Sequence, residues 1–250
     1  MHVFIDFIPI WVHKDVFYSY INKLPVILKL LTFLFKKYKN PVDSKTLKVI
    51  LDDNITPIAS EIGLKWNGKG MWIGSSENGI KKIISHRVGK GLMGTLAWGM
   101  CYDFLPIVSG KRVIFQRTFK SAGLQLFQSS VNDDNFSRDK SDLENGVTST
   151  WGEKECRKSV SKLILKRKNE IFNWLENGKT LDGSIHIALE QMEDENYNLH
   201  WPNPKYVASF LYAKKGLKKK GIEMLMEVDK ERLNHEREIL EKLKKRLTDL

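Results

Sequence analysis

The sequence predicts an α+β protein in which helices flank an antiparallel sheet and an all-helical subdomain follows it. Between residues 64 and 127, short runs of aromatic and β-branched residues alternate with turn signals such as Asn67-Gly68 and Asn78-Gly79. This pattern is typical of antiparallel strands joined by tight turns. From residue 151 onward, apolar residues recur instead at the spacing of one helix face. The two halves therefore predict a sheet and then helices.

The composition indicates a globular and strongly basic protein. The chain has 250 residues, 42% of them hydrophobic, and a formal net charge of +11. A chain of this length can bury a sizeable core. The charge fits an anionic partner, which could be nucleic acid, an acidic protein or a membrane surface, and it equally fits a lysine-rich cytosolic protein. The two well-separated cysteines form no disulfide framework, so we expect a reducing, cytoplasmic location.

Residues 1–43 predict an amphipathic helical segment. Its lysine cluster follows the apolar run, whereas a signal peptide carries its positive charge first. Lys23, Pro25 and Lys29 interrupt the run that a membrane span would need. The apolar face is expected to pack on the body or on a partner, with an in-plane membrane helix as the alternative. The candidate partner-binding residues on this face are Leu24, Leu28, Leu31 and Phe35.

Residues 44–127 are expected to form one helix and then the sheet. Asp43 or Ser44 can cap the helix at its start, and Gly63 is the expected stop. Pro57 lies inside the helical pattern and should kink the helix or divide it in two.

The stretch LAWGMCYDFLPIVSGKRVIFQRTFKS (96–121) predicts two strands. Residues 96–104 place large apolar side chains on one face and Ala, Gly, Cys and Asp on the other. The sequence PIVSGK (106–111) can make a turn, and the alternation resumes on a returning strand near 113–119. We expect this strand to return against the first.

Residues 128–150 predict a long polar loop or linker, because apolar residues nearly vanish there. This segment is the expected boundary between the two halves, with a helical subdomain over 151–250. Within the subdomain, helices are expected over 152–177, ending at Gly178, and over about 183–194.

Residues 204–229 resemble one tetratricopeptide-type helical hairpin. In such a hairpin, small residues let the two helices approach where they cross, and a glycine lies at the turn. Only one copy is visible, so we expect it to cap the subdomain rather than to form a peptide-binding array. The positions that carry the resemblance are Ala208, Ser209, Tyr212, Gly216, Gly221, Leu225 and Val228.

The last helix has a partial heptad pattern, which leaves open a homodimer through the C-terminal helix. Asp229 and Glu236 interrupt the pattern, so a helix packed on its neighbours is the preferred interpretation. The recurring residues are Met226, Leu233, Leu240 and Leu247, with Leu243 and Leu250 in complementary positions.

The order of elements resembles a group of uncharacterised bacterial α+β domains. The matching pieces are ITPIASEIGLKWNGKGMW (55–72), the strand pair over 96–119 and the helical hairpin near 208–228. The resemblance implies an α+β plan and a bacterial, soluble setting. It implies no catalytic residue.

Three ionisable residues of the predicted sheet, His86, Asp103 and Arg117, are the candidates for an enzymatic pocket. If the strands bring Asp103 and Arg117 together on the apolar face, their desolvation cost would favour a functional role. A cross-strand charge pair at the sheet margin explains the same residues more simply. The preferred interpretation therefore assigns no catalytic residue.

No cofactor or metal site is predicted. The segment HRVGKGLMGTL (86–96) resembles the pyrophosphate-binding loop of coenzyme A-dependent acetyltransferases, but one expected glycine is displaced to Gly94. A turn between two strands explains these glycines. The sequence has no His pair at i and i+4, no CxxC pair and no Asp-rich calcium loop. Cys101 has no catalytic signature around it and predicts a buried thiol.

A dense lysine cluster marks the hairpin turn and is the candidate nucleic-acid site. Contacts to a phosphate backbone need little beyond charge, although no aromatic residues are interleaved to stack unpaired bases. Lysines that complement a helix dipole are the simpler interpretation. The cluster comprises Lys214, Lys215, Lys218, Lys219 and Lys220.

The preferred function is a non-enzymatic protein-interaction module of a bacterial cytosolic protein. A nucleic-acid-associated protein that uses the lysine cluster is the first alternative. An enzyme with a pocket near His86, Asp103 and Arg117 is the second.

Overall fold

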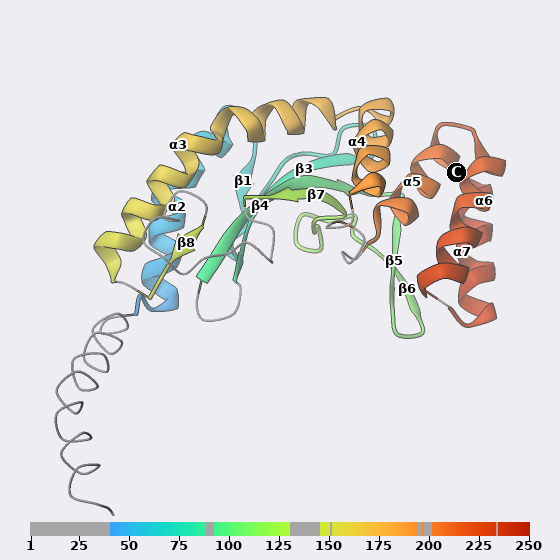
Figure 1. Ribbon diagram of the computed structural model, residues 1–250, viewed down its shortest axis with the longest axis horizontal. Helices are drawn as coiled ribbons and strands as arrows, with labels where there is room; N and C mark the ends of the chain where they lie inside the picture. Colours follow the sequence, from blue (N-terminus) through green and yellow to red (C-terminus); the bar gives the residue numbers. More distant parts are fainter. Residues whose placement is uncertain are drawn as a thin grey trace, which may run out of the picture.

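The computed structural model describes residues 41–88, 93–130, 146–150, 152–194, 197, 202–233 and 235–250. It shows a curled antiparallel sheet with helices over one face and further helices after it (Figure 1). The predicted α+β class is confirmed. No helix in these ranges is both long and apolar enough to cross a membrane. The predicted partner-binding residues Leu24, Leu28, Leu31 and Phe35 lie outside the described residues.

Helix α2 (Ser44–Glu61) begins at the expected cap. The Asp43 carboxylate accepts hydrogen bonds from Lys45 N at 2.8 Å and Thr46 N at 3.0 Å, which satisfies two N–H groups of the first turn. Pro57 does not divide the helix, because a single helix runs past it. The helix is tied to the sheet where Trp72 Nε1 donates to Thr56 Oγ1 at 2.7 Å.

The main sheet has the order β1–β2–β3–β4–β7, and β8 pairs with the start of β4. All pairings are antiparallel, and the longest joins β3 to β4 from Ile80↔Tyr102 to Val88↔Gly94. Its strands are β1 (Lys65–Trp66), β2 (Met71–Ile73), β3 (Ile80–Val88), β4 (Met93–Tyr102), β7 (Leu126–Ser129) and β8 (Val147–Thr148).

Side chains of β3 and β4 alternate between the two faces of the sheet, as the pattern of 96–104 predicts. One face, which includes Ile84 and Trp98, belongs to the main core with α2 and α3. The other face carries a smaller cluster that includes Ile83, Cys101 and Ala122. Ala122 belongs to the segment that precedes β7, so this segment covers part of the second face.

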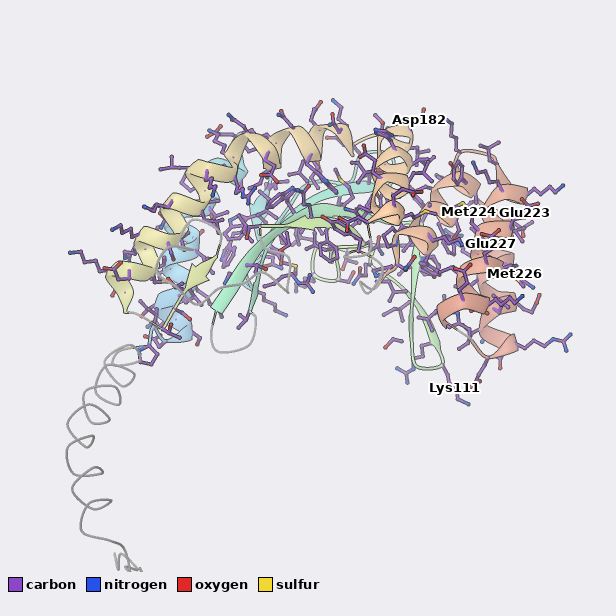
Figure 2. All side chains as sticks on the ribbon, in the orientation of Figure 1. Lys111, Asp182, Glu223, Met224, Met226 and Glu227 are labelled. Atoms are coloured by element: carbon purple, nitrogen blue, oxygen red, sulfur yellow. The ribbon has the colours of Figure 1, made fainter. Side chains whose placement is uncertain are left out.

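The expected pairing of 113–119 with 96–104 is wrong. Strands β5 (Pro106–Ser109) and β6 (Arg112–Phe115) instead form a separate two-stranded hairpin. Gly110 opens its two-residue turn with φ +57°, and both edges of β4 are already occupied by β3 and by β7 with β8. Lys111 at the tip of this hairpin points toward the start of the last helix, where its Nζ lies 3.1 Å from Glu236 Oε1 (Figure 2).

The second half of the chain is helical, close to the expected ranges. Helix α3 runs the length of the sheet and α4 crosses its end, while the later helices pack beyond it (Figure 1). The helices are α3 (Glu153–Asn177), α4 (Leu181–Glu193), α5 (Pro204–Lys214), α6 (Lys218–Val228), the π-helical turn η5 (Asp229–Leu233) and α7 (Arg237–Asp249).

The sheet and the helices share one continuous core, which extends from Ile50 in α2 to Leu247 in α7. The segment predicted as a boundary, 128–150, contributes the end of β7 and all of β8 to the sheet. The hairpin β5–β6 connects the sheet to the later helices, because Tyr206 Oη donates to Pro106 O at 2.9 Å.

Helices α5 and α6 form the hairpin at the positions of the tetratricopeptide resemblance, with Gly216 at the turn in a left-handed conformation (φ +91°). A Cβ on Gly221 would lie only 2.5 Å from Ser209 O. The backbones therefore approach where the sequence has small residues.

The heptad leucines do not form one helix face, because the chain leaves the α-helix at Val228 and re-enters one at Arg237. Leu243 and Leu247 are fully buried in the core of this chain. The side chains of Leu243 and Leu247 are therefore not exposed for contact with a second chain.

Candidate functional site

The structure separates His86 from the other two residues of the predicted enzymatic pocket. His86 lies on β3 opposite Leu96, whereas Asp103 follows the far end of β4. Leu96 and Asp103 are seven positions apart, which in a strand is about 23 Å. Burial lowers the pKa of His86 to about 4, so the imidazole is neutral near pH 7. Its Nε2 atom is buried and has no hydrogen-bond partner among the described residues.

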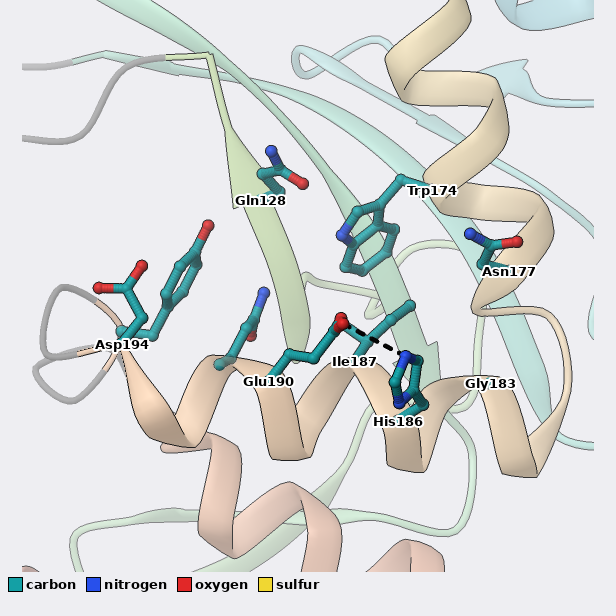
Figure 3. Close-up of a pocket in the computed structure, with 10 residues that line it drawn as sticks. Gln128, Trp174, Asn177, Gly183, His186, Ile187, Glu190 and Asp194 are labelled. Carbon is teal, nitrogen blue, oxygen red and sulfur yellow. Dashed lines mark ion pairs between the residues drawn. The ribbon is translucent and has the colours of Figure 1, made fainter.

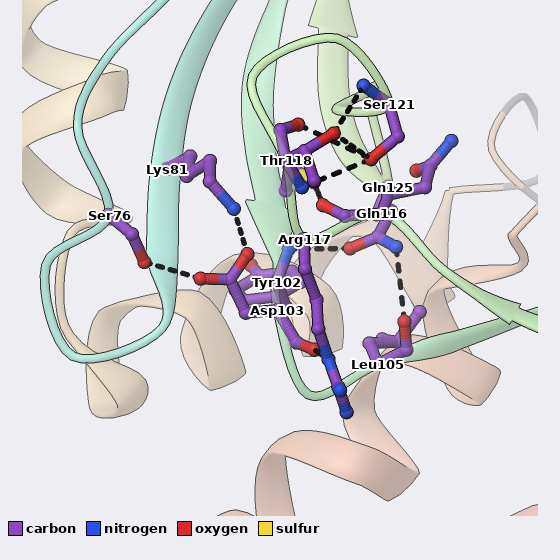
Figure 4. Close-up of polar contacts among 11 residues, drawn as sticks. Ser76, Lys81, Tyr102, Asp103, Leu105, Gln116, Arg117, Thr118, Ser121 and Gln125 are labelled. Atoms are coloured by element: carbon purple, nitrogen blue, oxygen red, sulfur yellow. Dashed lines mark hydrogen bonds and ion pairs between the residues drawn. The ribbon is translucent and has the colours of Figure 1, made fainter.

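Asp103 and Arg117 do meet, but their side chains do not form the ion pair that was considered for that case. Arg117 Nε donates to the backbone oxygen of Asp103 at 3.0 Å (Figure 4). The Arg117 guanidinium lies over the Phe115 ring, 4.2 Å from its centre. The Asp103 carboxylate instead pairs with Lys81 and accepts a hydrogen bond from Ser76 Oγ at 2.5 Å.

Lys81 is the residue that the sequence analysis missed in this cluster. Its side chain is only 6% exposed, against 25% for Asp103. Burial lowers the pKa of Lys81, and the charge interaction with Cys101 opposes that shift. Lys81 and Lys82 are neighbours in strand β3, so their side chains point to opposite faces of the sheet. Both faces carry buried apolar residues, and Lys81 is the lysine that is buried. Two adjacent lysines within an otherwise apolar strand are the feature of the sequence that could have identified Lys81.

The remaining polar groups near Asp103 hold the end of β4 in place. The Gln125 side chain accepts a hydrogen bond from Tyr102 N at 2.5 Å and donates one to Leu105 O at 3.3 Å (Figure 4). The Cys101 thiol donates to Gln116 O at 3.4 Å, and burial raises the pKa of this thiol. The buried position predicted for Cys101 is confirmed. These contacts satisfy buried backbone groups, which is a structural role.

The lysine cluster lies at the α5–α6 turn, but its members differ in electrostatic setting. Lys214 is in the last turn of α5, where a positive charge complements the helix dipole. The first turn of α6 begins with three lysines and has no side-chain cap, so the dipole interpretation is wrong there.

Most of these lysines also have partners within the chain. Lys215 pairs with Asp182, and Lys218 Nζ donates to Thr248 O at 2.6 Å. Lys220 Nζ lies 4.0 Å from the centre of the Tyr212 ring. The cluster thus joins α5 and α6 to α4 and α7.

A pocket opens between the end of α3, helix α4 and strand β7 (Figure 3). The turn from α3 to α4 forms one end of it. There Ser184 Oγ donates to Gly178 O at 2.7 Å, and Thr180 Oγ1 caps α4 by accepting from Gly183 N at 3.1 Å. A Cβ on Gly183 would lie 1.7 Å from Asn177 O, so only glycine permits this close approach.

The pocket has a volume of about 550 Å³, a size typical of ligand sites. Trp174 projects into it from α3, and His186 and Glu190 border it from α4 with Nε2 and Oε1 3.2 Å apart (Figure 3). Within the described residues, its lining is Gln128, Trp174, Asn177, Gly183, His186, Ile187, Glu190, Gln191, Asp194 and Tyr197.

The pocket is acidic, although the whole chain is basic. Segment 170–194 contains six carboxylate residues against a single lysine. Burial raises the pKa of Tyr197, and the nearby Asp194 and Glu170 carboxylates raise it further. The described lining contains no Lys or Arg side chain.

The described ranges contain no group of three or more His, Cys, Asp and Glu side chains arranged to hold a metal ion. Residues 89–92 of the glycine-rich segment 86–96 lie outside those ranges.

Comparison of the chain with protein-family models, with curated proteins and with solved structures finds no match.

The pocket could not be predicted from the sequence, because its lining comes from separate elements between residues 128 and 197. The feature that could have pointed to the pocket is the excess of acidic residues over 170–194 in an otherwise basic chain.

Proposed function

We propose that this chain is a non-enzymatic protein-interaction module, and that its interaction site is the pocket between α3, α4 and β7. One observation carries the proposal: acidic, amide and aromatic side chains line an open pocket of ligand size in a chain whose net charge is +11. Such a site attracts a basic group that the rest of the surface repels.

The charge of the pocket favours a protein partner over nucleic acid. Glu190 and Asp194 would repel a phosphate backbone, whereas a basic segment of a protein would gain from both. The lysine cluster remains the surface on which nucleic acid would bind. Within this cluster, Lys215 already pairs with Asp182, so a phosphate would have to displace that carboxylate to bind Lys215.

An enzymatic role has less support from the geometry. His86 lies far from Asp103, and the Asp103 carboxylate is engaged by Lys81 and Ser76. A general base needs an accessible acceptor beside the group from which it takes a proton.

The proposal is tested by affinity capture of the tagged full chain from nuclease-treated lysate of its host. The pocket variant combines Glu190→Gln with Asp194→Asn, which removes two charges and keeps the side-chain shapes. Glu193→Gln is the matched control, because Glu193 lies on the same helix, is exposed and does not line the pocket.

We expect the same captured protein with the wild type and the Glu193→Gln control, and its loss with the pocket variant. Capture that survives in the pocket variant, or no protein captured by the wild type from the nuclease-treated lysate, contradicts the proposal. Circular dichroism of each variant shows that the fold is retained.

A further inference from the structure

We infer that the pocket takes the guanidinium group of an arginine side chain. This inference rests on the proposed function and names the chemistry that the same site recognises.

Two glutamine side chains line the pocket, and each uses its amide N–H within the chain. Gln191 Nε2 donates to Phe127 O at 2.8 Å, and Gln128 Nε2 donates to Glu170 Oε1 at 2.8 Å. A carbonyl and a carboxylate can only accept, so the orientation of both amides is fixed. The Oε1 atoms that remain have no hydrogen-bond partner within the described part of the chain.

Gln191 is the more informative of the two, because its side chain belongs to a residue that is only 7% exposed. A buried amide normally uses both its donor and its acceptor. Because Gln191 lines the pocket, a bound group with N–H donors would find an acceptor in its remaining amide oxygen.

The carboxylates identify the charge of that group. Glu190 and Asp194 border the pocket on α4 and directly after it. His186 lies beside Glu190 but is 74% exposed at its side chain, so solvent screens this contact. A cation in the pocket would gain from the negative charge of these two lining residues.

The aromatic lining distinguishes arginine from lysine. The indole of Trp174 forms one wall and faces the side chains of α4 (Figure 3). A guanidinium is planar, stacks on aromatic rings and presents five N–H donors, whereas an ammonium presents three on a compact, strongly hydrated charge. A pocket lined by glutamine amides, carboxylates and an indole matches the guanidinium better.

The test uses three capped peptides of the form Gly-Ser-X-Ser-Gly, in which X is arginine, lysine or citrulline. Citrulline keeps the shape of arginine without its charge. Binding to the full chain is measured by titration calorimetry, and by ligand-observed magnetic resonance at millimolar concentration, for the wild type, the Glu190→Gln/Asp194→Asn variant and the Glu193→Gln control.

We expect the arginine peptide to bind the wild type and the control equally, and about tenfold more tightly than the lysine and citrulline peptides. The pocket variant should lose about tenfold or more in affinity for arginine. Equal binding of citrulline and arginine, tighter binding of lysine, or no arginine binding at millimolar concentration overturns the inference.

The two proposals fail in different ways. If protein capture depends on the pocket while the arginine peptide shows no preference, the arginine inference falls and the interaction site stands. If capture does not depend on the pocket, the proposed function itself is contradicted.

Discussion

The imidazole of His86 occupies the space that a side chain at position 94 would need. A Cβ on Gly94 would lie 2.1 Å from His86 Nε2, which is far inside van der Waals contact. The two residues are diagonal neighbours on β3 and β4, where His86 pairs with Leu96 and Val88 with Gly94. Gly94 therefore has to be a glycine as long as His86 keeps this position.

Gly94→Ala should lower the free energy of unfolding by about 2 kcal/mol, as expected for overpacking a buried site. His86→Ala opens the space, so the double variant should be less destabilised than the sum of the two single variants. Urea denaturation of all four proteins measures this coupling. Additive losses would show that the two side chains do not compete for space.

Stability should fall as pH drops from 6.5 toward 4, because of His86. The folded-state pKa is about 4, against the ordinary value of 6.5 for the unfolded chain. In this window the unfolded state binds the proton and the folded state does not, so lowering the pH favours unfolding by about 2 kcal/mol or more from this group. His86→Gln should lack this contribution. Urea denaturation at pH 7, 5.5 and 4.5 compares the two proteins, and parallel pH profiles would contradict the assignment.

Gly221→Ala should destabilise the hairpin by about 1–3 kcal/mol, although alanine favours helix by about 1 kcal/mol over glycine. The added methyl would meet Ser209 O at 2.5 Å and force α5 and α6 apart. Lys219→Ala, on an exposed position of the same helix, is the control and should change stability by less than about 0.5 kcal/mol. A thermal or urea midpoint at or above the wild-type value for Gly221→Ala would show that the helices can separate without cost.

Reversing single lysines at the α5–α6 turn should have opposite effects. Lys219→Glu places a negative charge in the first turn of α6 and should stabilise the protein by about 0.3–1 kcal/mol, whereas Lys214→Glu places one in the last turn of α5 and should destabilise it. Chemical denaturation at low salt measures both changes. Changes of the same sign would indicate that overall charge, rather than the helix dipoles, controls stability here.

Asp103→Asn should cost more stability than Lys81→Met. The first change leaves the Lys81 ammonium, which is 6% exposed at its side chain, without its carboxylate, and we expect a loss of about 2–3 kcal/mol. The second leaves a carboxylate that is still partly exposed and hydrogen-bonded to Ser76. Urea denaturation measures the loss of unfolding free energy in both variants. An equal loss, or a larger loss for Lys81→Met, would mean that the buried lysine does not need the Asp103 carboxylate.

The parts of the fold that the sequence predicted are those set by neighbouring residues. Alternation in 96–104 predicted the two faces of β4, and the capping chemistry of Asp43 predicted the start of α2. The partners of β4 could not be predicted, because β8 joins it from more than fifty residues downstream. Strand pairing depends on contacts that no local pattern contains.

The same limit applied to the candidate sites. The sequence left open whether Asp103 and Arg117 are adjacent. They are, but the Asp103 carboxylate pairs with Lys81, because Lys81 shares the second face of the sheet with Asp103. The pocket joins Gln128 of β7 to Trp174 of α3 and Glu190 of α4. No spacing along the chain relates these three residues.

The contact between α2 and α3 has a consequence for synthesis on the ribosome. Asp53 and Asn54 in α2 bind Arg157 and Ser161 in α3, which lie 104 and 107 positions later in the chain. At about 5–20 residues per second, α2 would wait roughly 5 to 20 s for its partner to emerge. During that interval the apolar face around Ile50 and Ile55 has no α3 to cover it. The nascent chain therefore passes through a stage in which chaperone binding or aggregation competes with folding, and many of its native contacts can form only late.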